Sequence, residues 1–252
     1  FQFNVGDVSA YSGNATMTIN VTPQQEAAVL SAIEGTTLNY TENAGPMAIS
    51  STINLTDIDN TQAQSATVKI TNNYQYGQDF LSFSDNIFIS SSWDQATGTL
   101  TLTGPADISY FISALRTVYY QNTSDDPSTL TRTISFNVND GTVNSNTISR
   151  NISIVAVNDA PVLANIESAS LLYTENDAAT NITSNLTLAD PDNTDIQGAT
   201  VQITSNYQNG QDVLSFINTG SITGSWNVAT GTMTLSGTDT KANYLAALKS
   251  VK

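Results

Sequence analysis

Apolar and polar residues alternate along much of the chain, which is the pattern of a strand with one buried face. The clearest runs are residues 66–71, 98–103 and 133–138, where Ala, Val, Leu, Ile or Phe alternate with mostly polar residues. Turn-forming segments separate such runs at the spacing of an antiparallel sandwich. These turns are residues 76–79, 96–98 and 139–141. We therefore expect an all-β protein.

One segment departs from this alternation. In residues 106–115 the apolar positions Ile108, Phe111, Ile112 and Leu115 fall at i, i+3, i+4 and i+7, which is helical spacing. We expect one or two helical turns there, packed on the edge of the sandwich. A connector that buries its apolar side explains this segment better than a helix that binds a partner.

The chain contains an internal repeat with a fixed offset. Residues 40–43, Tyr-Thr-Glu-Asn, recur at 173–176, which gives 173 − 40 = 133 residues. At that offset 252 − 133 = 119 residue pairs can be compared, and 51 of them are identical. Because the match extends through strands and turns without a gap, the two copies are expected to share one fold.

The repeat period predicts where the modules lie. Residues 1–25 correspond to the C-terminal strands of an upstream repeat, 26–159 form a complete repeat, and 160–252 form a second repeat that stops before its last strands. A sandwich without its last strands exposes unpaired strand edges.

Charge narrows the classes of partner. The 252 residues include 7 basic and 22 acidic ones, a net charge of 7 − 22 = −15. Such a field repels phosphate backbones and anionic membranes and favours divalent cations. No apolar run reaches the roughly 18 residues of a membrane span, and residues 1–5 show no signal-peptide pattern, so we expect any export signal outside this segment.

Catalysis has little support in the sequence, and we expect no enzymatic activity. Without histidine or cysteine there is no imidazole base, no thiolate and no tetrahedral zinc set. Paired carboxylates for glycoside hydrolysis stay formally open, although in tandem repeats they fit cation binding better. Trp93 and Trp226 recur with Tyr74 and Tyr207, which favours buried core anchors over a sugar-stacking platform.

The last part of the complete repeat carries a recognisable combination of motifs. It comprises residues 136–141, Phe-Asn-Val-Asn-Asp-Gly, then the strand 148–155, then 158–161, Asn-Asp-Ala-Pro. This combination resembles the end of a cadherin-type domain, and more closely the cadherin-like repeats of large bacterial surface adhesins, including gliding and biofilm adhesins. The resemblance implies tandem cadherin-like or Ig-like Greek-key β-sandwiches with one short helix per repeat.

The resemblance also implies calcium ions, Ca²⁺, held at module junctions by six to eight oxygens. The ligands at the downstream junction would be Glu42, Asn158, Asp159, Asp190 and Asp192, and those at the upstream junction would be Glu26, Asp57, Asp59 and Asp140. Upstream, Gln25-Glu26-Ala27-Ala28 replaces the Asn-Asp-Ala-Pro linker, so calcium there is the weaker expectation. The Asp-Arg-Glu element of animal cadherins has no counterpart; Leu115-Arg116-Thr117 stands near its place.

Two alternatives to metal binding concern these Asp residues. The Asp-x-Asp-Asn segments at 57–60 and 190–193 can form Asx turns that end a strand. An EF-hand loop fits poorly, because the twelfth position from Asp190 is Val201 and the sixth is Asp195.

The function that the resemblance implies is a calcium-stiffened stalk of a secreted, cell-surface adhesin on a Gram-negative bacterium, associated with the outer membrane. Its expected partners are calcium ions and neighbouring repeats of the same chain, with surface glycans or other cells contacted through other domains. Neither nucleic acid nor membrane insertion is expected. A carbohydrate- or homophilic-binding module and an accessory domain of a secreted enzyme are the alternatives.

Overall fold

The structure is a computed structural model that describes all residues 1–252. Contacts between Cα atoms divide the chain into two compact units. The first unit consists of Phe1–Asn39, Gly45–Gln121 and Thr131–Ser153. The second consists of Tyr40–Ala44, Asn122–Leu130 and Ile154–Lys252. Loops at the end of the complete repeat therefore belong to the second unit.

The complete repeat contains eleven strands and one helix, in this chain order: β3 (Val29–Ser31), β4 (Leu38–Thr41), β5 (Met47–Ala48), β6 (Asn54–Thr56), β7 (Gln62–Asn72), β8 (Asp79–Ser82), β9 (Ser90–Asp94), β10 (Thr99–Asp107), α1 (Ile108–Arg116), β11 (Tyr119–Asn122), β12 (Arg132–Asn139) and β13 (Ile148–Val155). They form a six-stranded sheet in the order β4-β13-β12-β7-β10-β9, a three-stranded sheet β5-β11-β8, and the pair β3-β6. The predicted all-β class is confirmed.

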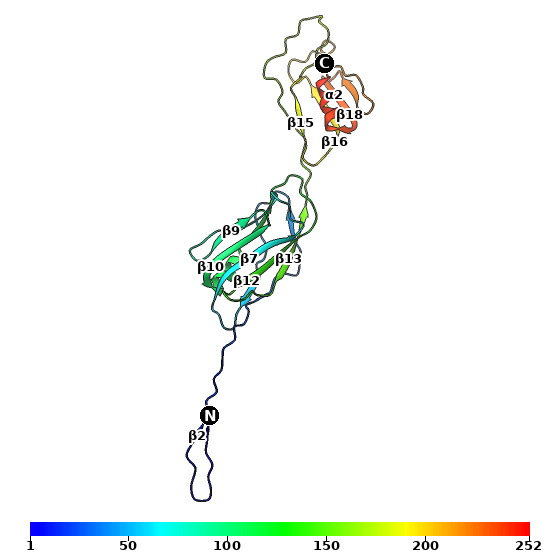
Figure 1. Cartoon of the computed structure of the whole chain (residues 1–252). Helices are drawn as coiled ribbons and strands as arrows, with labels where there is room; N and C mark the ends of the chain where they lie inside the picture. Colours follow the sequence, from blue (N-terminus) through cyan, green and yellow to red (C-terminus); the bar gives the residue numbers. More distant parts are fainter. The chain divides into compact units, whose positions relative to one another are not determined.

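The long strand β7 is the centre of the large sheet (Figure 1). It pairs antiparallel with β10 on one side and with β12 on the other, where Phe136 lies opposite Val68 and Val138 opposite Ala66. Alternate residues of these strands are buried, as the two-residue period predicted. Phe136 and Val138 are fully buried, so β12 closes the core over β7.

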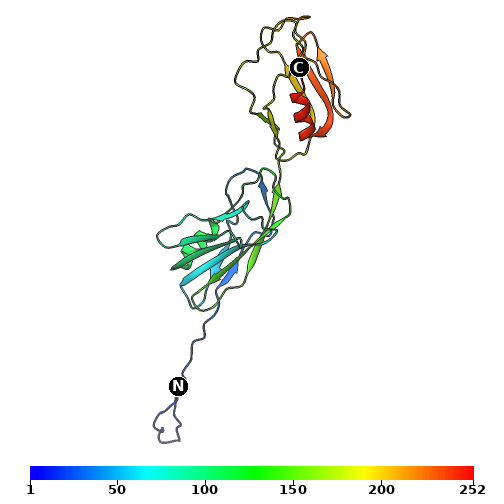
Figure 2. The same ribbon diagram turned by 45° about the horizontal axis from the view of Figure 1, so that its top comes forward.

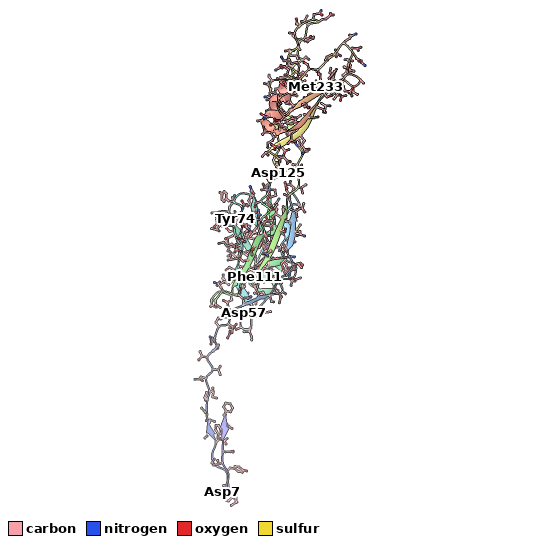
Figure 3. The ribbon with its side chains drawn as sticks, turned by 90° about the vertical axis from the view of Figure 1, so that its right-hand side faces the viewer. Asp7, Asp57, Tyr74, Phe111, Asp125 and Met233 are labelled. Atoms are coloured by element: carbon pink, nitrogen blue, oxygen red, sulfur yellow. The ribbon has the colours of Figure 1, made fainter.

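The helical prediction is confirmed by α1, which begins two residues after the predicted start and ends one residue after the predicted end. Phe111 and Leu115 are fully buried (Phe111 is labelled in Figure 3), and α1 contacts β6, β7 and β10. The helix is therefore a connector whose apolar side joins the core.

A buried ion pair lies within the same sandwich. Arg132 Nε donates to Asp79 Oδ2 at 3.1 Å, and both side chains are fully buried. The hydroxyl of Tyr120 donates to Asp79 Oδ1 at 2.6 Å. The three residues come from β12, β8 and β11, so this network links the two sheets across the core.

The second repeat has five strands and one helix, in this order: β14 (Val162–Ala164), β15 (Thr187–Ala189), β16 (Asp195–Gln202), β17 (Thr223–Asn227), β18 (Thr232–Thr240) and α2 (Lys241–Lys249). The strands form a sheet β16-β18-β17 and a pair β14-β15. Helix α2 lies along β16 and β18 and adds Tyr244 and Leu248 to the core (Figure 2). Met233 of this core is labelled in Figure 3.

Residues 1–22 form a separate hairpin whose strands are β1 (Gln2–Phe3) and β2 (Ala15–Thr16). Every one of these residues is exposed. The hairpin turn is closed by Asp7, whose Oδ1 accepts from the backbone N–H groups of Ser9 and Ala10.

Candidate metal centre

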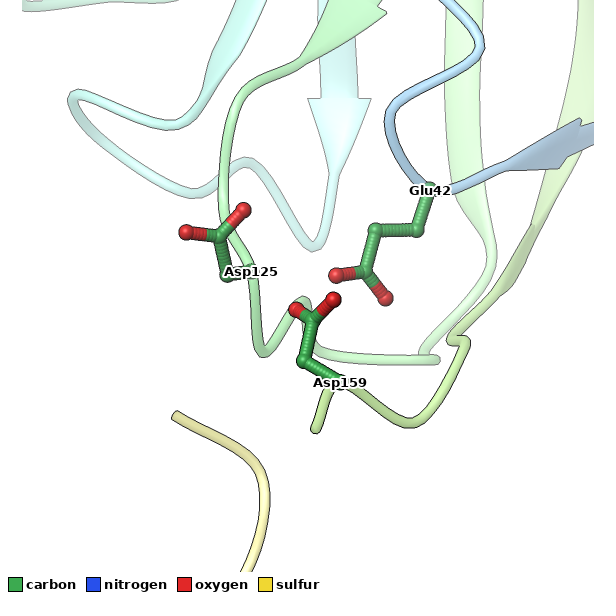
Figure 4. A group of neighbouring side chains, drawn as sticks. All are labelled: Glu42, Asp125 and Asp159. Atoms are coloured by element: carbon green, nitrogen blue, oxygen red, sulfur yellow. The ribbon is translucent and has the colours of Figure 1, made fainter. Parts of the chain in front are cut away.

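Three carboxylates converge in the second unit (Figure 4). Glu42, Asp125 and Asp159 each present a carboxylate oxygen, and these oxygens lie within 4.8 Å of one another. Glu42 directly follows β4, Asp125 lies in the loop between β11 and β12, and Asp159 follows β13. Three segments far apart in sequence therefore bring one acidic side chain each to the same place.

Two hydrogen bonds to the backbone at the end of β13 and in the segment after it hold Glu42 in place, one through its N–H and one through its side chain. Its N–H donates to the carbonyl of Val155 at 2.9 Å, and its Oε2 accepts from the N–H of Val157 at 2.8 Å. The residue is only 6% exposed, and its Oε1 is buried without a hydrogen-bond partner. A buried carboxylate oxygen left unpaired is costly, because it has lost its water and gained nothing in return.

Asp159 lies among further acidic groups. Its backbone N–H donates to Oδ2 of Asp192. Desolvation raises the pKa of its carboxyl group above the usual range, and the negative charges of Asp192, Asp125 and Asp190 raise it further. The contributions of these three neighbours mean that the ionised carboxylates repel one another when no cation lies between them.

The Asp-x-Asp segment of the second repeat forms the Asx turn that the sequence left open. Oδ1 of Asp190 accepts from the N–H groups of Asp192 at 3.2 Å and Asn193 at 2.8 Å. Asn158 is exposed, and its Oδ1 accepts from the side-chain amide of Asn193 at 2.6 Å. The Asx turn uses only Oδ1 of Asp190. The same residue could therefore form this turn and still offer Oδ2 to a metal ion.

Asp125 is the residue that the sequence analysis missed. It is exposed, and it accepts a long hydrogen bond of 3.4 Å from the side-chain amide of Asn43. Its counterpart at the repeat offset would be residue 258, so a comparison of the two copies within 252 residues could not mark it. The available signal was the acidic pair Asp125-Asp126 in a loop that follows a strand.

At the upstream end the same backbone pattern recurs 133 residues earlier. Glu26 donates its N–H to Oδ2 of Asp59 at 2.8 Å, as Asp159 does to Asp192. Oδ1 of Asp57 accepts from the N–H groups of Asp59 and Asn60, and its Oδ2 is buried without a partner. The altered linker sequence therefore keeps the backbone geometry.

Asp140 has a local role at this end. Its Oδ1 accepts from the N–H groups of Thr142 and Val143, which closes the turn between β12 and β13. Its Oδ2 is 3.5 Å from the side-chain amide of Asn60. The structure groups three carboxylates within 4.8 Å only around Glu42, and not here.

The donor set around Glu42 suits a hard cation. Calcium prefers carboxylate and carbonyl oxygens, and it tolerates irregular geometry. Nitrogen and sulfur ligands of the kind that zinc prefers are missing, because the chain has neither histidine nor cysteine. The unpaired Oε1 of Glu42 supplies a ligand atom that no protein donor satisfies.

The paired tryptophans are structural, but less buried than expected. Trp93 and Trp226 are half-buried, and each meets a tyrosine edge-to-face, Tyr74 at 6.2 Å and Tyr207 at 6.1 Å. The hydroxyl of Tyr74 donates to the carbonyl of Gln95, which holds the turn between β9 and β10. Tyr76 is 71% exposed, as its loop position suggested.

Among known proteins, this chain is similar to solved structures but matches no family and no curated protein. No protein-family description and no curated protein matches this chain. Domains 4–9 of the surface layer protein SbsC match over 93% of this chain and 30% of that one, with 11% identity and a TM-score of 0.27. The protocadherin GammaB4 extracellular domain matches over 84% and 28%, with 13% identity and a TM-score of 0.26.

Protocadherin Gamma B2, extracellular cadherin domains 1–5, matches over 82% of this chain and 32% of that one, with 12% identity and a TM-score of 0.24. This chain thus spans about a third or less of these three structures. Such low TM-scores do not establish a common fold, and the proposals below rest on the residues of this chain. None of its helices has the length and apolar character that crossing a membrane requires.

Proposed function

We propose that this chain is a structural repeat segment of an extracellular, calcium-binding adhesin, and that it serves as part of a stalk. The observation that carries the proposal is the buried, unpaired Oε1 of Glu42 beside the carboxylates of Asp125 and Asp159. The resemblance of the motifs around residues 136–161 to cadherin-like adhesin repeats supports the same reading. The role is mechanical and needs no catalytic group.

Three side chains from separate segments would bind the cation. Glu42 offers Oε1 from a side chain that Val157 already holds in place through Oε2. Asp125 and Asp159 offer exposed or half-exposed carboxylates from two other segments. A bound Ca²⁺ would supply the positive charge that these oxygens lack and would tie their segments together.

Stiffening follows from where these segments lie in the chain. Residues 40–44 and 122–130 belong to the complete repeat in sequence, while the second unit also contains all of 154–252. Asp159 is part of the linker, and its N–H binds Asp192 of the second repeat. Tying Asp159 to Glu42 and Asp125 would therefore restrict the linker at its first residues.

The proposed setting is the surface of a Gram-negative bacterium, where calcium is plentiful. Extracellular modules bind Ca²⁺ with dissociation constants on the order of 10⁻⁴ to 10⁻³ M, so the ion would be bound outside the cell. The net charge of −15 suits this setting, since it favours cations over nucleic acid.

The proposal is tested with the double variant Asp125→Asn/Asp159→Asn in the full chain. Melting and small-angle scattering are measured with Ca²⁺ and with a chelator. We expect wild type to melt higher and scatter as a stiffer particle in Ca²⁺, and the double variant to show neither change. Asp126→Asn is the matched control, because Asp126 is an exposed neighbour outside the carboxylate group. Identical profiles of wild type with Ca²⁺ and chelator would contradict the proposal.

A further inference from the structure

Two aromatic side chains stack on each other at the surface of the complete repeat, and we call them the aromatic pair. The ring centroids of Phe88 and Tyr110 are 4.1 Å apart, with 21° between the ring planes. Phe88 lies in the loop before β9, and Tyr110 is the third residue of α1. Phe88 is 42% exposed, Tyr110 is 40% exposed, and the neighbouring Ile87 is 89% exposed. Two large rings thus keep about two fifths of their surface in solvent although they contact each other.

The backbone that carries the aromatic pair is held in place. Oδ1 of Asn86 accepts from the N–H groups of Phe88 and Ile89, each at 2.9 Å, and the N–H of Asn86 donates to the carbonyl of Ile89 at 3.0 Å. Ile89 is fully buried and anchors this turn on the core. Tyr110 is followed in α1 by Phe111, which is fully buried too. Because both rings are already positioned, a ligand that binds them has little ordering cost to overcome.

The second repeat keeps the turn without the aromatic pair. At the offset of 133, the residues in place of the pair and of Ile87 are Ser221, Asn243 and Gly220. The N–H of Thr219 still donates to the carbonyl of Ile222 at 3.0 Å, and its Oγ1 accepts from the N–H of Ile222 at 3.2 Å. A hollow of about 510 Å³ lies here, and Gly220, Ser221 and Asn243 are part of its lining. The fold therefore does not require the aromatic pair, which favours a role in contact with a partner.

Polar groups accompany the aromatic pair on the same two elements. Asp85, in the loop of Phe88, is exposed, and its Oδ1 accepts from the N–H and the hydroxyl of Ser91, which leaves Oδ2 for a ligand. Ser113 is exposed three residues after Tyr110, so it lies on the same side of α1. Its hydroxyl donates to a backbone carbonyl at 2.9 Å and keeps its lone pairs for a donor. Apolar ring surface next to oxygen acceptors matches a sugar, which has C–H groups on the faces of its ring and hydroxyl donors at the rim.

The exposed area limits the size of the partner. Covering an aromatic side chain completely buries roughly 150–250 Å², so two rings that are about 40% exposed offer roughly 120–200 Å² together. A stable protein partner or a second copy needs about 800 Å² on each side. Even with Ile87 added, the patch stays well below that area. One sugar ring is therefore a better fit than a protein surface.

We propose that the aromatic pair of Phe88 and Tyr110 binds a neutral hexopyranose unit of a glycan. The C–H groups on one face of the sugar stack on the exposed ring surface, and the hydroxyls at its rim donate to Asp85 and Ser113. The net charge of −15 disfavours acidic sugars. The site belongs to the complete repeat alone and shares no residue with the carboxylate group around Glu42. It therefore adds recognition to the proposed stalk function, and chelator is expected to leave it unchanged.

The test replaces the aromatic pair by the residues of the second repeat, as Phe88→Ser/Tyr110→Asn in the full chain. The second repeat forms the same turn and helix with these residues, so the variant is expected to fold. The probes are methyl β-D-glucopyranoside and methyl β-D-galactopyranoside, titrated by NMR. Wild type is expected to bind at least one of them with a dissociation constant on the order of 1–10 mM, as so small a contact permits. The double variant is expected to bind at least about tenfold more weakly, because the apolar contact area is lost.

Tyr76→Asn is the matched control. Tyr76 is a 71% exposed tyrosine of the same repeat, and its counterpart is Asn209. This variant is expected to bind as wild type does. Phe88→Leu keeps an apolar side chain without the flat ring, so it is expected to weaken binding as well. It also serves as the second variant should the double variant fail to fold.

Four results would overturn the proposal. The first is wild type that binds neither glycoside, and the second is binding that Phe88→Leu and the double variant leave unchanged. The third is binding of tetramethylammonium in place of both glycosides, which would indicate a site for cations. The fourth is self-association of wild type in sedimentation that the double variant abolishes, which would indicate that a second copy covers the aromatic pair.

Discussion

Glu42→Gln is expected to be more stable than wild type in chelator and to lose some or all of that advantage in calcium. The buried Oε1 of Glu42 has no hydrogen-bond partner, while Oε2 accepts from Val157. A glutamine can keep the Val157 bond through its oxygen and turn its amide toward Asp125 and Asp159, which accept hydrogen bonds. Because an unpaired buried polar group costs about 1–3 kcal/mol, we expect the variant to gain about that much in chelator.

With calcium, the difference in free energy of unfolding between the variant and wild type is expected to become smaller or to change sign. At about 10 mM Ca²⁺ and a dissociation constant of about 0.1 to 1 mM, linkage adds about 1.4 to 2.7 kcal/mol to the free energy of unfolding of the wild type. Glu42→Gln loses the buried ligand and should gain far less. A purely structural role of Glu42 predicts the same difference under both conditions.

The free energy of unfolding is measured by urea titration in a Trp226→Phe background. Trp93, in β9, then reports the complete repeat alone. Glu175→Gln is the control, because Glu175 occupies the same position in the second repeat and is exposed. A Glu42→Gln variant that is less stable than wild type in chelator, or equal stabilisation of both proteins by Ca²⁺, would refute this prediction.

Two further predictions concern the sandwich itself. Burial raises the pKa of Glu34, but hydrogen bonds from Ser50 and Ser51 outweigh that effect and lower the pKa to about 2. A group whose pKa is lowered by folding stabilises above its unfolded pKa and loses this contribution as the pH falls through its folded pKa. Wild type should therefore lose a stabilising contribution between pH 4.5 and 2, the range of this shift, that Glu34→Gln lacks. Because Glu34 is partly exposed, solvent screening reduces this contribution to about 1–2 kcal/mol, below the roughly 3 kcal/mol that the full shift would give. Identical acid unfolding curves would contradict this prediction. Arg132→Met leaves Asp79 as an uncompensated buried charge and should cost about 3–5 kcal/mol in urea titration. The control Arg116→Met removes an exposed side chain that donates to the carbonyl of Ile53, and a similar loss there would argue against the special role of the buried pair.

The strands and the helix could be predicted from the sequence because their signals are local. The alternation in residues 66–71 and the helical spacing at 108–115 each depend on neighbours within a few positions. The fixed offset of 133 then carried the assignment of elements from one copy to the other. The structure adds an equivalent hydrogen bond in each copy, from the N–H of Glu26 to Asp59 and from the N–H of Asp159 to Asp192. The Asp-x-Asp segments form the Asx turns that the sequence offered as an alternative to metal binding, and such turns are open to sequence reasoning because Asx hydrogen bonds span only three residues.

The tertiary structure decided which distant groups meet. Asp125 joins Glu42 and Asp159 because the C-terminal ends of β11, β4 and β13 lie close together in the fold. The sequence of residues 123–131 contains no signal that predicts this proximity. The same applies to the burial of Asp79 with Arg132, whose strands belong to different sheets. Local pattern determines which face of a strand is apolar, whereas the pairing order and register of the sheets determine which side chains share a site.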